Sequence, residues 1–229
     1  MSHQWHSSSK VRRTLSSSKV DKPLARFEKL ENFNFCKEKI MSYFKVYIIN
    51  GSGGSGKDTF CDLVWTAMDN FDPHCLVHTY HTSAPAKKWA SLMGWDEETK
   101  RPMDRRFLCE LKDMLDYWDN VTYKYLKEKI EGVLYNYTTF DRKILFLHAR
   151  EDKDITWIKE YCCKKGIYCK TIKVNRKVLN ENSKYGNHAD DDVSKSGIAY
   201  DYVIDNNGTK VDLTKEVYNN FIYKEDLFQ

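Results

Sequence analysis

The chain has 229 residues, of which 41% are hydrophobic and 31% are charged, and this composition suits one α/β domain with a full core. Its seven cysteines include no Cys-x-x-Cys pair, so the sequence indicates neither a disulfide framework nor a zinc site. There is no apolar stretch long enough to span a bilayer and no signal-peptide core at the start, so we expect a cytoplasmic protein without a membrane partner.

The formal net charge of +4 originates at the beginning of the chain. Residues 1–40 carry nine Lys and Arg against four Asp and Glu, whereas the remainder is close to neutral. Two serine runs and few apolar side chains predict a disordered basic tail ahead of a folded domain at 41–229. A basic tail is able to contact nucleic acid, but we favour the alternative of a solvated leader without a partner.

A phosphate-binding loop follows the first predicted strand. Residues 45–59 read KVYIINGSGGSGKDT, in which 46–49 suits a buried strand and the following residues match G-x-x-x-x-G-K ahead of a helix at 58–70. Glycines let the backbone turn its N–H groups toward phosphate oxygens, and the helix N-terminus adds partial positive charge. The residues that we expect to bind ATP are Gly51, Gly53, Gly54, Ser55, Gly56, Lys57, Asp58 and Thr59.

Asp58 stands where a Ser or Thr hydroxyl normally meets Mg²⁺. A carboxylate is a hard oxygen ligand, so we predict that Asp58 holds Mg²⁺ directly or through a water, while Thr59 serves the α-phosphate. The alternative is that Asp58 only caps the helix, where an acidic side chain is favourable. The two roles are compatible.

Further along, strands alternate with helices, as a parallel sheet with crossover helices requires. Strands at 76–80, 144–148, 167–174 and 202–204 complete a predicted five-stranded parallel sheet, with helices at 83–93, 104–118, 121–135, 155–165 and 213–223. Residues 82–140 are thus a helical insertion, expected to bind the acceptor, and the polar stretch 176–197 is a predicted lid.

Arginines at strand ends are candidates for phosphate clamping. In doubly wound sheets ligands bind beyond the carboxyl ends of the strands, and Arg150 follows the third strand while Arg176 follows the fourth. The guanidinium fork suits phosphoryl transfer, so we expect Lys57, Arg150 and Arg176 to act in catalysis. A third group, Arg101, Arg105 and Arg106, begins the helical insertion; the alternative for any single arginine is a surface ion pair.

Motifs that are absent from the sequence narrow the class of protein. His78 and His81 lie three residues apart across a strand and point to opposite faces, so we do not expect a histidine metal site there. No Asn-Lys-x-Asp guanine signature is present, and no strand ends in the Asp-Glu pair of motor-type ATPases. A phosphate loop, an arginine-bearing insertion and a polar lid together indicate a small-molecule kinase.

Four segments carry a resemblance to a known family: GSGGSGKDT at 51–59, SAPAKKWASLMGWDEETKRPMDRRFL at 83–108, HAREDKDITWIKE at 148–160 and YDYVIDNNGT at 200–209. In these the chain resembles the phage-type deoxynucleoside monophosphate kinases and their bacterial relatives in the nucleoside-monophosphate-kinase superfamily. The resemblance implies a P-loop kinase three-layer fold, ATP with Mg²⁺, and a nucleoside monophosphate acceptor under a closing lid. It assigns Lys87 and Arg106 to the acceptor side, Arg150 to the acceptor phosphate and Arg176 to the lid. We expect Arg105, beside Arg106, to bind the acceptor as well.

Two alternatives stay open. P-loop phosphomevalonate kinases look similar across 83–87, so the acceptor is a nucleoside monophosphate or another small phosphate. Asp190, Asp191 and Asp192 stand where further lid arginines would be expected, so the second alternative is a catalytically silent nucleotide-binding sensor or scaffold.

Overall fold

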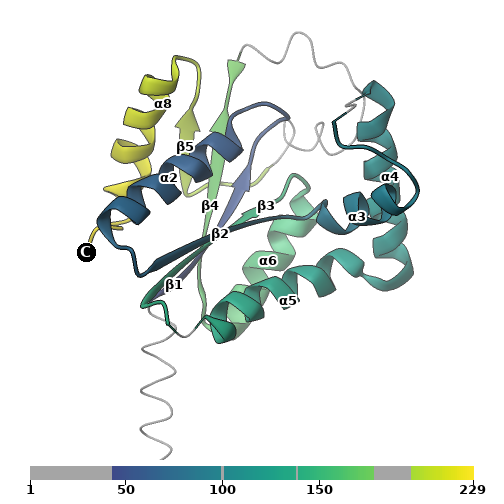
Figure 1. The fold of residues 1–229 in the computed structure, drawn as a ribbon, viewed down its shortest axis with the longest axis horizontal. Coiled ribbons are helices and arrows are strands. Elements are labelled where there is room, and N and C mark those ends of the chain that lie inside the picture. The colour runs from purple at the N-terminus through teal and green to yellow at the C-terminus, as the bar shows by residue number, and fades with distance from the viewer. Residues whose placement is uncertain (1–42, 99–100, 138, 178–196) are drawn as a thin grey trace, which may run out of the picture. The chain divides into compact units, whose positions relative to one another are not determined.

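The computed structural model describes residues 43–98, 101–137, 139–177 and 197–229 (Figure 1). The chain divides into two units, residues 1–37 and 38–229, and the fold below belongs to the second. The predicted tail at 1–40 lies outside the described residues, as does most of the predicted lid at 176–197. None of the described helices combines the length and apolar character needed to cross a membrane.

Five parallel strands form one sheet in the order β2-β3-β1-β4-β5. The apolar β1 lies at the centre, where helices cover both of its faces. The predicted five-stranded parallel sheet is confirmed, and its strand ends differ from the predicted ones by at most two residues. The strands are β1 (Phe44–Asn50), β2 (Cys75–His81), β3 (Arg142–His148), β4 (Tyr168–Asn175) and β5 (Tyr202–Asp205).

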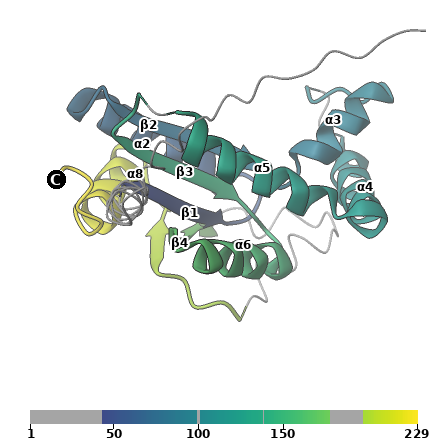
Figure 2. The ribbon, with the colours of Figure 1, turned by 90° about the horizontal axis from the view of Figure 1, so that it is seen from below.

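Helices lie on both faces of the sheet, which gives the three layers visible in Figure 2. Side chains of β1 alternate between two cores, with Tyr47 and Ile49 in one and Val46 and Ile48 in the other. The first core is closed by α2 (Lys57–Phe71), α8 (Lys210–Val217) and the π-helical turn η2 (Tyr218–Ile222), and the second by α5 (Val121–Asn136) and α6 (Asp152–Lys165).

Two helix starts differ from the predicted ones because of local capping. α6 begins three residues before the predicted 155, where Glu151 is the N-cap and acidic side chains follow in the first turn. α8 begins three residues before the predicted 213, because Thr209 and Asp212 form a capping box. Apolar periodicity alone misses such polar first turns.

The strand order creates a switch point between β1 and β3. β1 continues into α2 on one face of the sheet, whereas β3 continues into α6 on the opposite face. In open α/β sheets ligands bind in the crevice at such a point, outside the carboxyl ends of the strands. Figure 2 shows α3 (Ala84–Leu92) and α4 (Pro102–Asp119) beyond these ends, so they form a wall for that crevice.

The helices of the predicted insertion at 82–140 lie in two different places. α3 and α4 stand over the carboxyl ends of the strands, whereas α5 packs Leu126, Ile130 and Val133 into the second core. Asn120, at φ 50°, turns the chain between α4 and α5; asparagine is one of the few residues that adopts this left-handed conformation readily.

The C-terminal segment is tied to the sheet through one buried carboxylate. Glu225 accepts hydrogen bonds from the hydroxyls of Tyr47, Tyr168 and Tyr202, and its carbonyl accepts from Lys45 Nζ at 3.0 Å. These donors come from β1, β4 and β5, so a single side chain connects three strands to the end of the chain.

We predict that Glu225→Gln lowers the free energy of unfolding by about 1.5–3 kcal/mol, because the amide removes charge from the hydrogen bonds that three tyrosine hydroxyls make to this buried side chain. Urea unfolding followed by circular dichroism measures this. The neighbouring Asp226→Asn is the matched control: Asp226 is exposed at φ 54°, which asparagine also adopts, so its change should stay below about 0.5 kcal/mol. Equal losses in both variants would contradict the assignment.

Candidate active site

The phosphate loop connects β1 to α2 and packs closely against the end of β4 and the residue that follows β5. A Cβ on Gly51 would lie 2.5 Å from the carbonyl oxygen of Val174 in β4, and one on Gly56, at φ +100°, would lie 2.3 Å from Asn206 Nδ2. Asn206 follows β5 and donates to the Ser55 carbonyl at 2.8 Å. Only glycine fits at these two positions, so the motif is required by packing as well as by phosphate access.

Lys57 begins α2 and is 7% exposed. Its Nζ donates to the carbonyl oxygens of Gly51 at 2.6 Å and Ser52 at 2.8 Å, because a buried ammonium needs acceptors. The ammonium of Lys57 therefore does not face solvent. Lys57 nevertheless lines the cavities on both sides of the loop, as described next.

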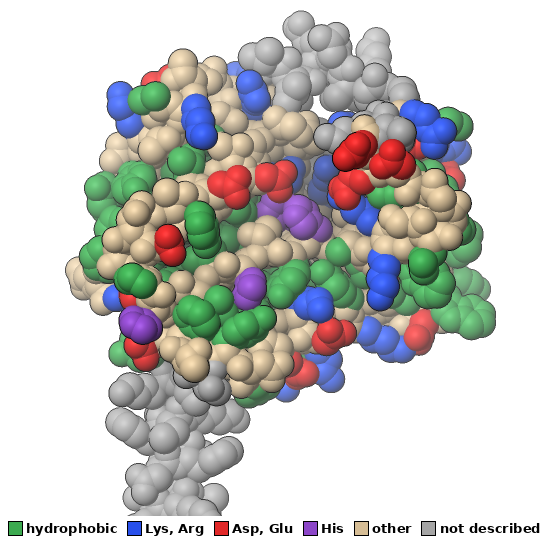
Figure 3. All heavy atoms as spheres, viewed as in Figure 1, with side chains coloured by type: hydrophobic (Ala, Val, Ile, Leu, Met, Phe, Trp, Pro, Cys, Tyr) green, Lys and Arg blue, Asp and Glu red, His purple; other side chains and the backbone are tan. Residues whose placement is uncertain are grey.

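Two cavities meet at the phosphate loop, and Gly54, Lys57 and Asp58 line both of them. The first, of about 330 Å³, lies between the loop and the helices α3 and α4. The second, of about 390 Å³, lies between the loop and the residues that follow β4 and β5. Acidic, basic and histidine side chains gather around a hollow at the carboxyl end of the sheet (Figure 3).

The second cavity combines predicted and unpredicted residues. Thr59 and Arg176 line it, as their sequence positions suggest, together with Asn206, Gly208 and Lys210. Asn206 and Gly208 belong to the loop between β5 and α8, Lys210 begins α8, and the sequence reasoning assigned none of the three a role. Their signal in the sequence is the Asn-Asn-Gly-Thr-Lys stretch directly after the fifth strand, at the rim where ligands bind.

The first cavity contains most of the predicted acceptor residues. Lys87 of α3, Arg105 of α4 and Arg150 after β3 line it. The backbone at Arg150 is fixed by Asn50, whose Nδ2 donates to the Arg150 carbonyl at 3.3 Å, and the guanidinium of Arg105 lies beside Gly53 of the phosphate loop. The insertion therefore reaches the loop directly.

Arg106 is a correction to the prediction. Its side chain is 74% exposed and pairs with Glu110 at 2.7 Å on the outer side of α4, so it does not line the cavity. Adjacent residues on a helix point about 100° apart, and the face that carries Arg101, Arg105 and Cys109 is the one turned to the site.

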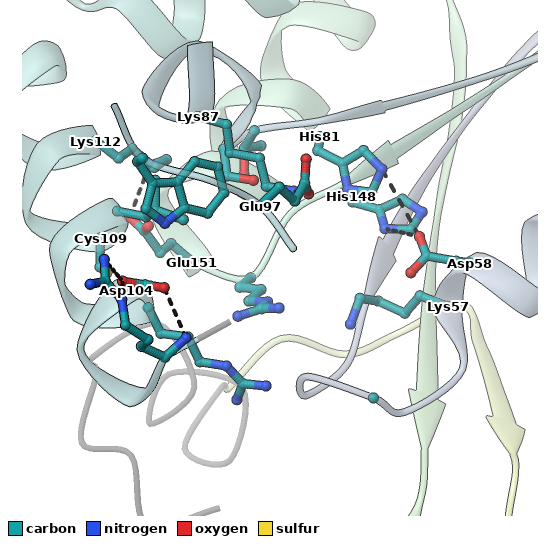
Figure 4. A pocket seen from close by; sticks show the side chains of 18 residues that line it. Lys57, Asp58, His81, Lys87, Glu97, Asp104, Cys109, Lys112, His148 and Glu151 are labelled. Atoms are coloured by element: carbon teal, nitrogen blue, oxygen red, sulfur yellow. Dashed lines mark hydrogen bonds and ion pairs between the residues drawn. The ribbon is translucent and has the colours of Figure 1, made fainter. Parts of the chain in front are cut away.

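Opposite charges are paired within the first cavity. Lys87 pairs with Glu97, and Arg101 Nη2 lies 3.1 Å from Asp104 Oδ1. Figure 4 shows Lys87 and Glu97 near each other at the wall of the cavity. The lining has six Lys and Arg side chains and four carboxylates, and one of the six, Lys112, is buried among carboxylates of α4 and α6.

A buried lysine connects α4 to α6. Lys112 Nζ lies 3.1 Å from Glu151 Oε1, 3.1 Å from Asp154 Oδ2 and 3.3 Å from Asp116 Oδ2. Burial lowers the pKa of Lys112, but the carboxylates of Asp154, Glu151 and Asp116 outweigh it and raise that pKa. The sequence reasoning missed this cluster, because its members are about 40 residues apart and only the Lys112–Asp116 spacing is local.

Two histidines face Asp58 at the start of α2. Asp58 Oδ1 lies 4.0 Å from His81 Nε2 and 3.7 Å from His148 Nδ1, and Figure 4 shows both rings turned toward this carboxylate. Burial, together with His81, Lys57 and Arg150, lowers the pKa of His148 to about 2, and burial also lowers the pKa of His81. Both imidazoles are therefore uncharged near neutral pH.

The partner of His81 in this cluster is a histidine from another strand. His78 and His81 do point to opposite faces of β2, since His78 packs against Tyr80 and Tyr137. The partner of His81 is instead His148, which lies opposite it in the neighbouring strand β3. The carboxylate of Asp58 is 79% exposed beside the phosphate loop, and its role as a ligand of Mg²⁺ stays a prediction.

Comparisons with known proteins give distant structural likeness. A scan against models of protein families finds no match, and a search of curated proteins also finds none. Among solved structures, a variant of the APS kinase CysC of Mycobacterium tuberculosis is 11% identical with a TM-score of 0.40, covering 77% of this chain and 96% of that one. The same kinase in complex with AMPPNP and APS is 10% identical, with the same TM-score and coverage.

A protein of Chloroflexus aurantiacus, provisionally described as a kinase, is 12% identical with a TM-score of 0.41, covering 78% of this chain and 99% of that one. At these values the likeness carries no argument about reaction or acceptor. The resemblance to phage-type deoxynucleoside monophosphate kinases therefore stays a prediction.

We predict that Lys112→Met lowers the free energy of unfolding by about 3–5 kcal/mol, because it leaves buried carboxylates without their cation. Lys153→Met is the matched control: this lysine is 46% exposed while pairing with Glu151 and Asp113, so its loss should stay below about 1 kcal/mol. Chemical denaturation at pH 8 measures both.

The deficit of Lys112→Met should shrink as the pH falls from 8 to 5. Burial raises the pKa of Asp154 to about 6 although Lys112 lowers it, so removing Lys112 raises that pKa further, and the folded variant binds its proton at a higher pH than the wild-type protein does. Protonation then removes one of the unpaired charges. A deficit that is constant or larger at pH 5 would contradict the role given to these carboxylates.

Proposed function

We propose that this protein transfers the γ-phosphoryl group of ATP to a nucleoside monophosphate, and in particular to a deoxynucleoside monophosphate. The observation that supports this most is that two cavities meet at the phosphate loop and share Lys57. A donor in one and an acceptor in the other would bring the reacting groups together beside the lysine. Phosphoryl transfer depends mainly on such positioning and on neutralising charge.

The donor belongs in the second cavity. There the phosphates would meet the backbone of the glycine loop and the N-terminus of α2, and Thr59 and Arg176 supply further polar groups. Asp58 would hold the Mg²⁺ that accompanies ATP. The metal supplies charge neutralisation at the phosphates, whereas Lys57 would bind the β- and γ-phosphates from the loop side.

The acceptor belongs in the first cavity, which most of the predicted acceptor residues line. Arg150 at the end of β3 and Arg105 of α4 would bind its phosphate, since a guanidinium fork matches phosphate oxygens. Trp95 gives the same cavity an aromatic surface on which a base is able to stack. A monophosphate oxygen already carries negative charge, so this acceptor needs no general base.

An ADP-release assay over a panel of acceptors tests the proposal. The panel contains the four deoxynucleoside monophosphates, the ribonucleoside monophosphates, phosphomevalonate and a sample without acceptor. Turnover that depends on a nucleoside monophosphate supports the proposal, whereas turnover only with phosphomevalonate reassigns the acceptor. ATP binding without ADP release for any acceptor supports the silent nucleotide-binding alternative.

We predict that Arg150→Lys raises the acceptor KM and lowers kcat while ATP affinity is nearly unchanged. Lysine keeps the charge but loses the fork, and a desolvated contact of this kind is worth about 2–4 kcal/mol of transition-state stabilisation. Arg106→Lys, on the outer side of α4, is the matched control and should leave both KM values unchanged. Steady-state kinetics with each substrate varied in turn measures these changes. Equal behaviour of the two variants would contradict the role given to Arg150.

A further inference from the structure

Three side chains from different elements converge beside the phosphate loop. His81 ends β2 and His148 ends β3, and the two residues lie directly opposite each other in the parallel register. His81 lies four residues after Val77 and His148 two residues after Phe146, and both of these apolar residues pack in the first core. Side chains at even spacing in a strand share a face, so the two histidines face α2, whose first turn carries Asp58. One oxygen and two nitrogen atoms of these residues lie within 4.8 Å of one another.

His148 has a polar neighbour at each of its two ring nitrogens. The Nε2 atom of His148 lies 3.4 Å from Cys61 Sγ, one turn along α2 from Asp58. In the tautomer that donates this N–H to sulfur, the lone pair on Nδ1 faces the Asp58 carboxylate at 3.7 Å. Two acceptors facing each other repel unless a proton or a cation lies between them. A second ring N–H held by a neighbour is also the usual environment of metal-binding histidine.

We propose that Asp58, His81 and His148 bind a first-row transition-metal dication such as Zn²⁺ or Co²⁺. Two imidazole nitrogens with one carboxylate oxygen form a donor set that these ions favour, whereas Mg²⁺ prefers oxygen ligands. Tetrahedral zinc with ligand bonds of 2.0–2.1 Å needs ligand atoms about 3.3 Å apart. The two separations from Asp58, 3.7 Å and 4.0 Å, exceed this value by less than 1 Å, and all three ligand atoms lie within 4.8 Å of one another.

The surroundings make the site open rather than closed. Asp58 is 79% exposed at its side chain and His81 is 41% exposed, so an ion can reach them from the first cavity, which all three residues line. Three protein ligands leave at least one position for water or a phosphate oxygen. Lys57 and Arg150 lie near enough to influence His148, and their positive charge weakens the binding of a dication in the absence of an anion.

This site goes beyond the proposed kinase function, and its test needs neither nucleotide nor turnover. The full chain is stripped with a chelator, dialysed, and titrated with Co²⁺ followed by visible absorption and with Zn²⁺ followed by calorimetry. We expect one ion per chain with a cobalt spectrum of low coordination number. Other histidines and cysteines are present in every sample, so only differences between variants are interpreted.

His81→Ala and Asp58→Ala should each weaken Zn²⁺ binding by about 10- to 100-fold, and Asp58→Glu should restore most of the affinity. His78→Ala is the matched control, since His78 lies on the same strand and packs against Tyr80 and Tyr137 on the other face. Melting temperatures in chelator establish that each variant is folded. His148→Gln is a third test if that buried variant folds.

Equal Zn²⁺ affinity in the wild-type protein, His81→Ala and Asp58→Ala would overturn the proposal, as would a loss in His78→Ala as large as theirs. A cobalt spectrum identical to that of the hydrated ion would overturn it too. Because no kinase measurement enters, a failure of this site leaves the proposed function standing, and a failure of the kinase proposal leaves the metal site standing.

Discussion

The close fit of the glycine loop against the β4–β5 edge is the constraint on which the site depends. A Cβ on Gly51 or Gly56 would lie less than 3 Å from its neighbour, so no larger side chain fits where the loop leaves β1. The path of the loop sets the direction of α2, and α2 in turn positions Lys57, Asp58 and Cys61. The pairing of β1 with β4 brings Asn50 opposite Lys173. This pairing therefore fixes the positions of the groups that would donate hydrogen bonds to a phosphate before any ligand binds.

The wall of the first cavity is fixed by a different interaction. Lys112 ties α4 to the beginning of α6, and α6 follows the strand that ends in His148 and Arg150. The face of α4 turned to the cavity is thus held in register with the strand end. Buried ion clusters contribute little net stability compared with apolar packing, but they penalise every arrangement that separates the charges. We infer that the cluster selects one orientation of the insertion.

Features encoded by neighbouring residues could be predicted from the sequence. Features that depend on which strands and helix faces meet in space could not. The phosphate loop, the sheet and the helices follow from contiguous patterns, because glycine spacing and apolar periodicity are local properties. Arg105 and Arg106 were equivalent by sequence, since nothing local shows which face of α4 meets the loop. His81 and His148 are 67 residues apart in number, and only the pairing of β2 with β3 makes them neighbours. The Lys112 cluster was hidden for the same reason.

The first cavity is lined by both positive and negative side chains, and this affects which ligands it can bind. Lys87 and Arg101 already pair with Glu97 and Asp104, so an incoming anion competes with carboxylates for these cations. A dianionic phosphate competes better than a singly charged group, because attraction scales with charge. Carboxylates displaced in this way would need hydrogen-bond donors from the same ligand, since an unpaired acceptor in a cavity is costly. The nucleoside monophosphate proposed above would meet both demands, because it has a phosphate at one end and N–H and O–H donors elsewhere.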